Sequence, residues 1–234
     1  MTTNAPVSPS RISPLDALAG NSFCRVASAQ QFDGNSVRLL CDGDANYPAW
    51  LAAIAGAKHS VNLENYLLRE DRIGQTFSDA LIEAARRGVS CRVIYDWLGC
   101  SRKTSPDFWR KMRDAGVDVR CYNPPHFSDP LMSVSRDHRK LLCVDHDLAF
   151  TGGLCIGDDW AGYPEKGIPP WRDTGLEIRG PAASHLGETF ADSWRATGGA
   201  PYEVAPGEAA RQGDRKSTRL NSSHSRRSRM PSSA

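Results

Sequence analysis

Apolar and polar residues follow two different periods along the middle of the chain. Segments in which every second residue is apolar are typical of half-buried strands, whereas apolar residues three and four positions apart indicate amphipathic helices. Residues 76–87 show the helical period, and Gly88 after them is a typical helix stop. The pattern predicts strands at 37–41, 60–68, 89–96 and 117–122, with helices between them at 47–57, 76–87 and from Ser105-Pro106 to Gly116.

The pattern changes after Pro124-Pro125. Two short apolar runs, 140–144 and 148–151, are joined by three polar residues and predict a hairpin. A last strand is predicted at 174–179, and Gly180-Pro181 opens a final helix. Strands separated by helices of about 10–15 residues favour parallel pairing through right-handed crossovers. We therefore expect an α/β fold with a mixed, largely parallel sheet covered by helices on both faces.

Composition divides the chain into three parts. Residues 1–35 are rich in Pro, Ser and Ala without periodicity and predict a flexible segment, whereas residues 36–200 predict one lobe with its own core. Residues 201–234 include a run of Ser, Arg and Asn that cannot bury enough apolar surface to fold. Because residues 214–224 also resemble a translated sequencing adapter, we expect 201–234 to be a disordered artefact that replaces the natural continuation of the chain.

The positive charge of the chain lies in that last part. The net charge is +2, but residues 214–234 hold six basic residues and one acidic residue. Without them the chain has 23 basic and 26 acidic residues, a net charge of −3. A nucleic-acid partner is therefore not favoured, since nucleic-acid surfaces are strongly basic.

Cysteine usage and hydropathy bear on the compartment. The seven cysteines show no CxxC pairing, and several lie inside apolar runs, which indicates buried reduced thiols and no zinc site. No apolar run approaches the roughly 20 residues that span a bilayer, and the first residues do not resemble a secretory signal. We expect a cytoplasmic location.

The residues that point to chemistry are His138 and Lys140. On an extended segment, two residues that are two apart lie on one face, with Arg139 on the other. An imidazole can attack phosphorus or transfer a proton near neutral pH, and an ammonium group can neutralise phosphoryl oxygens as charge develops. Asp145, at the far end of the predicted short strand, can accept hydrogen bonds. The pair suits phosphoryl transfer, and the alternative is a chance meeting of two surface residues.

A longer spacing pattern connects this pair to a known family. His-x-Lys-x4-Asp is followed six residues later by Gly152-Gly153, which resembles the signature of the phospholipase D superfamily. The segments SVNLENYLL, ALIEAARRGVSCRVIYD, AGVDVRCYNP and PWRDTGLEIRGPAA are similar to the bacterial cardiolipin synthase branch, from Val37 to Trp194. One position departs from the signature: Cys155 stands where the family has an Asn that donates to phosphate, and a thiol is a weak donor.

The resemblance implies roles for individual residues. The catalytic set would be His138, Lys140 and Asp173, with Asp145 as the structural acid of the motif. Each active site in the family uses two such motifs, so that one His forms a phosphohistidine and the other protonates the leaving alcohol. His138 would be one half of that pair, and no other His here has Lys two residues on. The substrate-binding set would be Glu64, Gly152, Gly153 and Cys155. For Asp173 a plain turn residue, and for Glu64 a buried ion pair, remain as alternatives.

The resemblance also implies the reaction and its partners. It implies a phosphatidyltransferase of cardiolipin synthase type, peripheral to the inner membrane, with a phospholipid substrate, a second phospholipase D lobe, and neither metal nor cofactor. The alternatives are a homodimeric phosphodiesterase or nuclease of the same fold, and a catalytically inactive interaction lobe, which the Cys155 departure favours. Aromatic residues in the loop after the motif, Trp160, Tyr163 and Trp171, either pack on the lobe or enter a lipid headgroup layer.

Overall fold

The computed structural model describes residues 22, 26, 30–125 and 135–202. The chain divides into two compact units, Met1–Asp33 and Gly34–Ala234, and the architecture below is that of the second. Most of the segment 1–35, predicted to be flexible, lies outside the described residues. So does all but the first two residues of the segment 201–234, predicted to be a disordered artefact.

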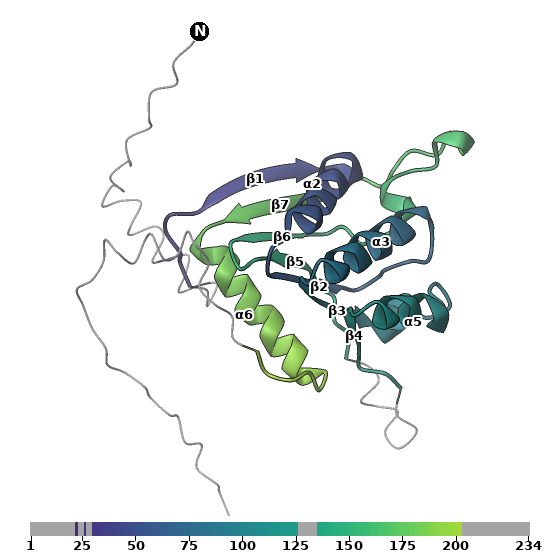
Figure 1. The fold of residues 1–234 in the computed structure, drawn as a ribbon. Coiled ribbons are helices and arrows are strands. Elements are labelled where there is room, and N and C mark those ends of the chain that lie inside the picture. Colours follow the sequence, from purple (N-terminus) through teal and green to yellow (C-terminus); the bar gives the residue numbers. More distant parts are fainter. Residues whose placement is uncertain (1–21, 23–25, 27–29, 126–134, 203–234) are drawn as a thin grey trace, which may run out of the picture. The chain divides into compact units, whose positions relative to one another are not determined.

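Seven strands within the described residues form one mixed sheet, in the order β1-β7-β6-β5-β2-β3-β4 (Figure 1). The α/β class and the mixed sheet are confirmed, but the sheet is not largely parallel. Only the β2–β3 and β3–β4 pairs are parallel, and the other four pairs are antiparallel. The strands are β1 Ser36–Cys41, β2 Ser60–Asn65, β3 Ser90–Asp96, β4 Asp118–Tyr122, β5 Lys140–Val144, β6 Leu148–Gly152 and β7 Thr174–Arg179.

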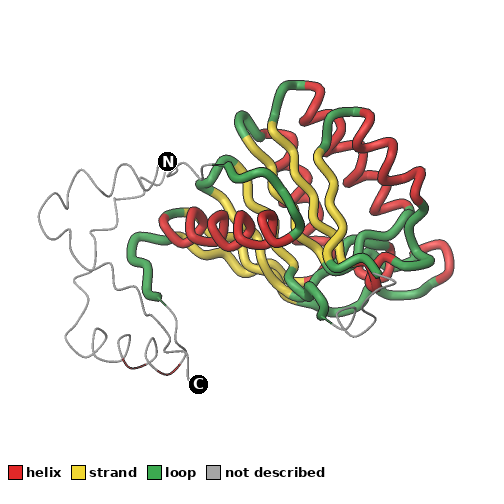
Figure 2. The backbone as a smooth tube through the Cα atoms, turned by 90° about the horizontal axis from the view of Figure 1, so that it is seen from below, coloured by secondary structure: helices red, strands yellow, loops and turns green. Residues whose placement is uncertain are grey.

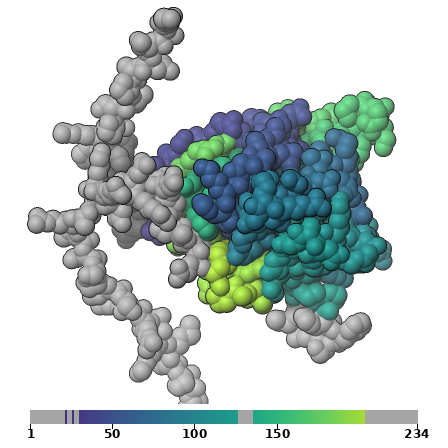
Figure 3. Space-filling model, viewed as in Figure 1, coloured from purple at the N-terminus to yellow at the C-terminus, as the bar shows by residue number. Residues whose placement is uncertain are grey.

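Segments far apart in the sequence meet at one side of this sheet. β1 pairs with β7 along its whole length, from Ser36 opposite Arg179 to Cys41 opposite Thr174. Figure 3 shows the early residues, in purple, lying against the green residues of β7. β1 therefore closes the antiparallel half of the sheet, and it is this long-range pairing that the local pattern does not reveal.

Helices cover both faces of the sheet, as predicted (Figure 2). Among the described elements, α6 (Pro181–Ala196) is the helix that packs on one face, where Phe190 and Trp194 are fully buried against Leu141 and Cys143 of β5. Each fully buried side chain of this size contributes on the order of 1.5–3 kcal/mol. The opposite face is covered by α2 Asp42–Gly56, α3 Arg72–Arg86, α4 Trp97–Cys100 and α5 Pro106–Asp114.

Two helices start earlier than the hydrophobic pattern predicts, because tertiary contacts and capping extend them. α2 begins at Asp42, five residues before the predicted start, where the buried Asn46 side chain donates to the backbone oxygens of Leu40 and Asp42. α3 begins at Arg72 because the Asp71 carboxylate accepts a hydrogen bond from the Gly74 N–H and caps the helix. Both extensions bring polar residues to the same edge of the sheet.

The candidate residues lie at one end of the sheet, where β2 and β6 end and where β5 and β7 begin. Lys140 at the start of β5 is paired with Asn65 at the end of β2, and Asn65 is paired in turn with Tyr95 of β3. On the other side, Gly152 at the end of β6 is paired with Gly175 at the start of β7. The segments before β5, after β6 and before β7 therefore all lie at this end of the sheet.

The six described cysteines are unpaired, which confirms the prediction of free thiols for this part of the chain. Burial raises the pKa of the Cys91 thiol to about 11 and also raises that of Cys155, so these thiols are neutral near pH 7. Within the described ranges, no helix has both the length and the apolar composition needed to cross a bilayer.

Candidate active site

His138 and Lys140 lie together at the entrance of β5 and contact the same aromatic ring. The His138 ring centroid is 4.7 Å from that of Tyr66, and the Lys140 Nζ is 5.2 Å from the same centroid. The His138 side chain is exposed, whereas Lys140 is only 5% exposed and donates from Nζ to the His138 backbone oxygen at 2.7 Å. An accessible imidazole therefore stands directly beside a buried ammonium group.

The two faces of β5 separate the flanking residues as the spacing predicts. Lys140 shares its face with Leu142 and Val144, which belong to the core under α2 and α3. The Arg139 guanidinium lies on the other face, 3.4 Å from the Glu64 carboxylate and hydrogen-bonded to Ser193 of α6. An open cleft of about 420 Å³ beside His138 is lined by Tyr122, Arg136, Asp137, Arg139, Asp192, Ser193 and Ala196.

Electrostatics around Lys140 involve two of the other predicted residues. Burial lowers the pKa of the Lys140 ammonium, and electrostatic interaction with Cys155, Asp137 and Asp173 acts in the opposite direction. The structure thus brings Asp173 and Cys155 into the electrostatic environment of Lys140. The Cys155 side chain is buried, and its thiol has the weak donor character expected from the sequence.

Asp173 lies immediately before β7 with both carboxylate oxygens engaged. Oδ2 accepts from the Trp160 indole N–H at 3.1 Å, and Oδ1 accepts from the Thr174 N–H at 2.7 Å. A Cβ at Gly153 would lie 2.2 Å from Asp173 Oδ1, and a Cβ at Gly152 would lie 2.5 Å from the Thr174 backbone oxygen. The glycine pair therefore has a steric role: it lets β6 and the Asp173 carboxylate approach closely.

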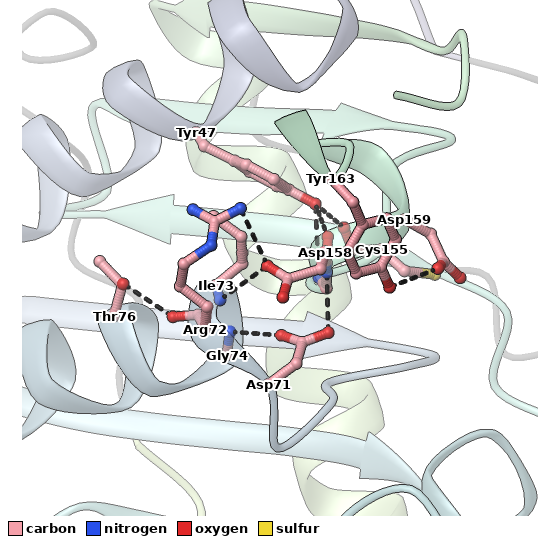
Figure 4. A network of polar contacts seen from close by, with 11 residues as sticks. Tyr47, Asp71, Arg72, Ile73, Gly74, Thr76, Cys155, Asp158, Asp159 and Tyr163 are labelled. Atoms are coloured by element: carbon pink, nitrogen blue, oxygen red, sulfur yellow. Dashed lines mark hydrogen bonds and ion pairs between the residues drawn. The ribbon is translucent and has the colours of Figure 1, made fainter. Parts of the chain in front are cut away.

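Tyr47 fixes the backbone around Cys155 (Figure 4). Its hydroxyl is 2.7 Å from the Cys155 backbone oxygen and 3.1 Å from that of Gly157. Burial raises the pKa of this phenol far above its ordinary value, so it stays a neutral donor. One hydroxyl from α2 thereby positions the segment that carries the departure from the family signature.

A network of aspartates anchors the residues that follow Cys155 to the start of α3 (Figure 4). Asp71 accepts from the Gly74 N–H at 3.0 Å and from the Asp158 N–H at 2.7 Å. The Asp158 carboxylate accepts from the Ile73 N–H and pairs with the Arg72 guanidinium at 3.2 Å. The η2 turn, Asp158–Trp160, is therefore held by caps and ion pairs, and it in turn presents the Trp160 indole to Asp173.

Asp145, expected to be the structural acid of the motif, lies at the opposite end of β5 from His138. Seven residue steps, five of them ending on residues of β5, separate it from His138, which in an extended chain is on the order of 20 Å. Its carboxylate accepts from the backbone N–H groups of Lys58, His59 and Ser60 at 2.7–2.8 Å. Asp145 and His146 both have positive φ values, 51° and 61°, in the three-residue loop 145–147 between the paired residues Val144 and Leu148. Asp145 is a structural acid.

Glu64 also differs from the substrate-binding expectation. In β2 it is directly opposite Leu141 of β5, which faces α6, so its side chain lies on the other side of the sheet from Lys140. The side chain is 0% exposed and is paired with Arg139. The structure favours a buried contact with Arg139 for Glu64 over a direct contact with substrate.

Sequence reasoning missed the residues that hold the site together, namely Tyr47, Tyr66, Asp71 and Trp160 as a donor to Asp173. Asp71 had a recognisable signal, since an Asp just before a helical pattern is a frequent N-cap. Tyr47 and Tyr66 had none, because only the tertiary fold brings them to Cys155 and His138. Within the described part of the chain, no three His, Cys, Asp or Glu side chains are arranged as a metal site.

Comparisons with known proteins agree with this arrangement. A family model described as "Cardiolipin synthase, PLD-like domain" matches residues 50–158. Cardiolipin synthase 1 of Bacillus cereus is 37% identical over 163 residues, 69% of this chain and 32% of that protein. Cardiolipin synthase A of Pseudomonas fluorescens is 34% identical over 161 residues, 68% of this chain and 33% of that protein. The chain spans about a third of the length of these curated relatives.

Solved structures show the same fold at lower identity. NUC from Salmonella typhimurium, a phospholipase D family member, matches with a TM-score of 0.52 and 19% identity, over 69% of this chain and 95% of that chain. Phosphatidylserine synthase from Haemophilus influenzae matches with a TM-score of 0.52 and 15% identity, over 65% of this chain and 34% of that chain. The fold is therefore that of one lobe of phospholipase D type. The sequence relatives place it further: the chain belongs to the cardiolipin synthase-like branch of the phospholipase D superfamily.

Proposed function

We propose that this chain forms one catalytic lobe of a phosphatidyltransferase of cardiolipin synthase type that acts through a phosphohistidine. The observation that carries the proposal is the exposed imidazole of His138 beside the buried ammonium group of Lys140. The Lys140 Nζ donates to a neutral carbonyl oxygen, which leaves its positive charge to stabilise an anion. A phosphodiester that approaches His138 from solvent would meet that charge.

In the proposed reaction, a ring nitrogen of His138 attacks the phosphorus of a phospholipid. A nitrogen–phosphorus bond forms and the phosphorus–oxygen bond to the leaving alcohol breaks, with a histidine of a second lobe giving its proton to the departing oxygen. An acceptor hydroxyl then transfers its proton to that second histidine, and its oxygen displaces His138 from phosphorus. Lys140 stabilises the charge on the non-bridging oxygens in both steps. The two histidines exchange roles if His138 acts as the acid.

Two other functions are each supported by one observation. The match to NUC covers 95% of that chain, so a lobe of this size makes up almost the whole of a chain with the same fold. This favours a homodimer in which two copies of His138 face each other. The thiol of Cys155 at the phosphate-binding position of the family favours an inactive interaction lobe instead. We rank both below the transferase, because the identity to cardiolipin synthases reaches 37%.

The proposal is tested by trapping the intermediate. The chain is combined with a second lobe from a cardiolipin synthase relative, incubated with phospholipid labelled in the phosphatidyl group, and denatured in alkali, which preserves phosphohistidine. We expect label on one histidine of the pair, formation of transfer product, and no turnover by the isolated monomeric chain. The exposed His185 on α6 is the internal control and should carry no label. Turnover by a demonstrably monomeric chain would contradict the two-lobe requirement.

We also propose that the loop between β6 and β7 contacts the membrane surface from the cytoplasmic side. Trp160 in this loop is buried, but Trp171 and Ile168 are 56% and 49% exposed. Figure 1 shows the loop, in green, running out past the ends of the strands. Exposed apolar side chains beside Lys166 and Arg172 suit an interface of acyl chains and anionic headgroups.

Vesicle binding tests the loop. Replacing Ile168 and Trp171 together by Ser should weaken binding of the chain to phosphatidylglycerol vesicles about tenfold or more, since each apolar side chain that enters the interface contributes on the order of 1 kcal/mol or more. The matched control replaces Val37 and Leu39, which are as exposed on β1, by Ser. Equal binding by the two double variants would contradict a specific role of the loop.

A further inference from the structure

A cluster of polar side chains lies behind the strand that begins at Lys140, on the face covered by α6. It consists of the buried Glu64 in β2, Asp137 just before β5 and Ser193 in α6, together with the half-exposed Arg139. The Glu64 side chain is fully buried and Asp137 is 7% exposed. Two buried carboxyl groups thus share one guanidinium group, whose Nη1 is 3.4 Å from Glu64 Oε1.

If both carboxyl groups are ionised, each is left with a buried oxygen that accepts no hydrogen bond from a described residue. Glu64 Oε2 and Asp137 Oδ2 are each buried without a donor among the described residues. Both carboxyl groups are held by Arg139, whose Nη1 is 3.4 Å from Glu64 Oε1 and whose backbone N–H donates to Asp137 Oδ1. Two carboxylates are both pure acceptors and cannot bond to each other, whereas one added proton would let the two side chains form a donor–acceptor pair. A shared proton also removes one of two like charges from a buried site.

We propose that Glu64 and Asp137 share one proton at neutral pH and that this acid pair positions the segment that carries His138. The positioning role rests on the function proposed above, whereas the shared proton does not. Asp137 directly precedes His138 in the chain, so the pair acts on the imidazole through the backbone and not by touching substrate.

The backbone contacts of Asp137 show how the positioning works. Its N–H donates to Asp96 Oδ2 at 3.0 Å, and its Oδ1 accepts from the Arg139 N–H at 3.1 Å. The residues on both sides of His138 are therefore fixed by Asp137. If both carboxyl groups were charged, their repulsion would push Asp137 away from Glu64 and would move the His138 backbone with it.

The environment of Glu64 supports the shared proton. Burial, then the hydrogen bond and charge of Asp137, raise the pKa of Glu64 to about 8, while Ser193 and Arg139 act in the opposite direction. Near neutral pH Glu64 is therefore mostly protonated. Asp96 of β3, and Arg136 and Asp192 at the adjoining cleft, are charged groups near this site. Cys143 of β5, Tyr202 after α6 and Arg92 of β3 also lie near it, and the Arg92 guanidinium is 3.9 Å from the Tyr202 ring centroid.

The shared proton is tested directly by nuclear magnetic resonance. The 234-residue chain is labelled with ¹³C at the side-chain carboxyl of Glu and titrated, and the Glu64→Gln variant identifies the Glu64 resonance. We expect a midpoint for Glu64 well above the ordinary value of 4.5. Asp137→Asn should lower this midpoint by removing the like charge, and Arg139→Gln should raise it by removing the counter-charge. Titration of Glu64 together with the exposed Glu residues would overturn the proposal.

The stability of the chain gives a second measurement that does not need the Asp137 or Arg139 variants to fold. Because the folded-state pKa of Glu64 lies above its unfolded value, the folded chain holds a proton that the unfolded chain loses. Stability should therefore decrease as pH rises from about 4.5 to about 8. Glu64→Gln, which keeps the shape of the protonated acid, should flatten this part of the profile. An unchanged slope in Glu64→Gln would overturn the shared proton.

The positioning role is tested in the two-lobe enzyme by a pH profile. Above pH 8, the transfer rate of the parent should decrease relative to that of Glu64→Gln, with a limiting slope of about tenfold per pH unit for the loss of one proton. Parallel profiles would refute positioning but would leave the titration result in place. An enzyme that transfers no phosphatidyl group at all would instead contradict the proposed function.

Discussion

Replacement of His138 by Ala in the assembled two-lobe enzyme should reduce phosphatidyl transfer by more than about 1,000-fold. His138 is the exposed imidazole at the entrance of β5, and its neighbours, the Tyr66 phenol and the buried Lys140 ammonium group, offer no second imidazole. A missing transition-state donor costs about 100- to 1,000-fold, and the loss of the covalent carrier is expected to cost more. The initial rate of transfer with labelled phospholipid measures the effect.

The control for this prediction is His185→Ala, which changes an exposed histidine of α6 and should leave the rate unchanged. Circular dichroism of both variants separates loss of chemistry from loss of fold. If His138→Ala retains more than about a tenth of the parent rate, less than about 1.4 kcal/mol is left for His138 to explain, and its catalytic role is wrong.

Replacement of Lys140 by Met should reduce the transfer rate by about 100- to 1,000-fold, or about 2.7–4 kcal/mol, through loss of charge stabilisation. Met preserves the packing of the buried stem under Tyr66, so the variant should fold. The maximal rate should decrease more than the apparent affinity for phospholipid, since the charge acts mainly in the transition state.

A charge change elsewhere on the lobe provides the comparison for Lys140. Lys103→Met removes an exposed ammonium group and should retain the parent rate. Similar rates for the two variants would show that the charge of Lys140 is not used in the reaction.

The sequence predicted the positions of the strands and helices better than it predicted which strands pair and in which direction. Local periodicity placed all seven strands, the hairpin of β5 and β6, and helices on both faces. It overestimated the parallel part, because the partner of a strand is set by contacts far along the chain. β1 is followed by a helix like a strand in a parallel unit, yet it pairs antiparallel with β7, more than 130 residues later.

The same difference separates the correct and incorrect expectations for the site. The spacing of His138, Arg139 and Lys140 was enough to place Arg139 on the face opposite Lys140, because alternation along a strand is a local property. Whether Glu64 shared a face with Lys140 depended on the register between β2 and β5, which the sequence does not encode locally. Tyr66 was missed for the same reason.

The hydrogen bonds of Asp145 help to determine which side chain of the β5 segment lies beside His138 at the candidate site. Asp145 ends β5 and holds the three N–H groups at the start of β2, so one carboxylate fixes the alignment of two neighbouring strands. A slip of β5 by one residue would reverse every side chain along it, placing Arg139 where Lys140 now lies and burying the lysine under α6. From the far end of the strand, Asp145 therefore sets which cation stands beside His138 and would meet the phosphate in the proposed reaction.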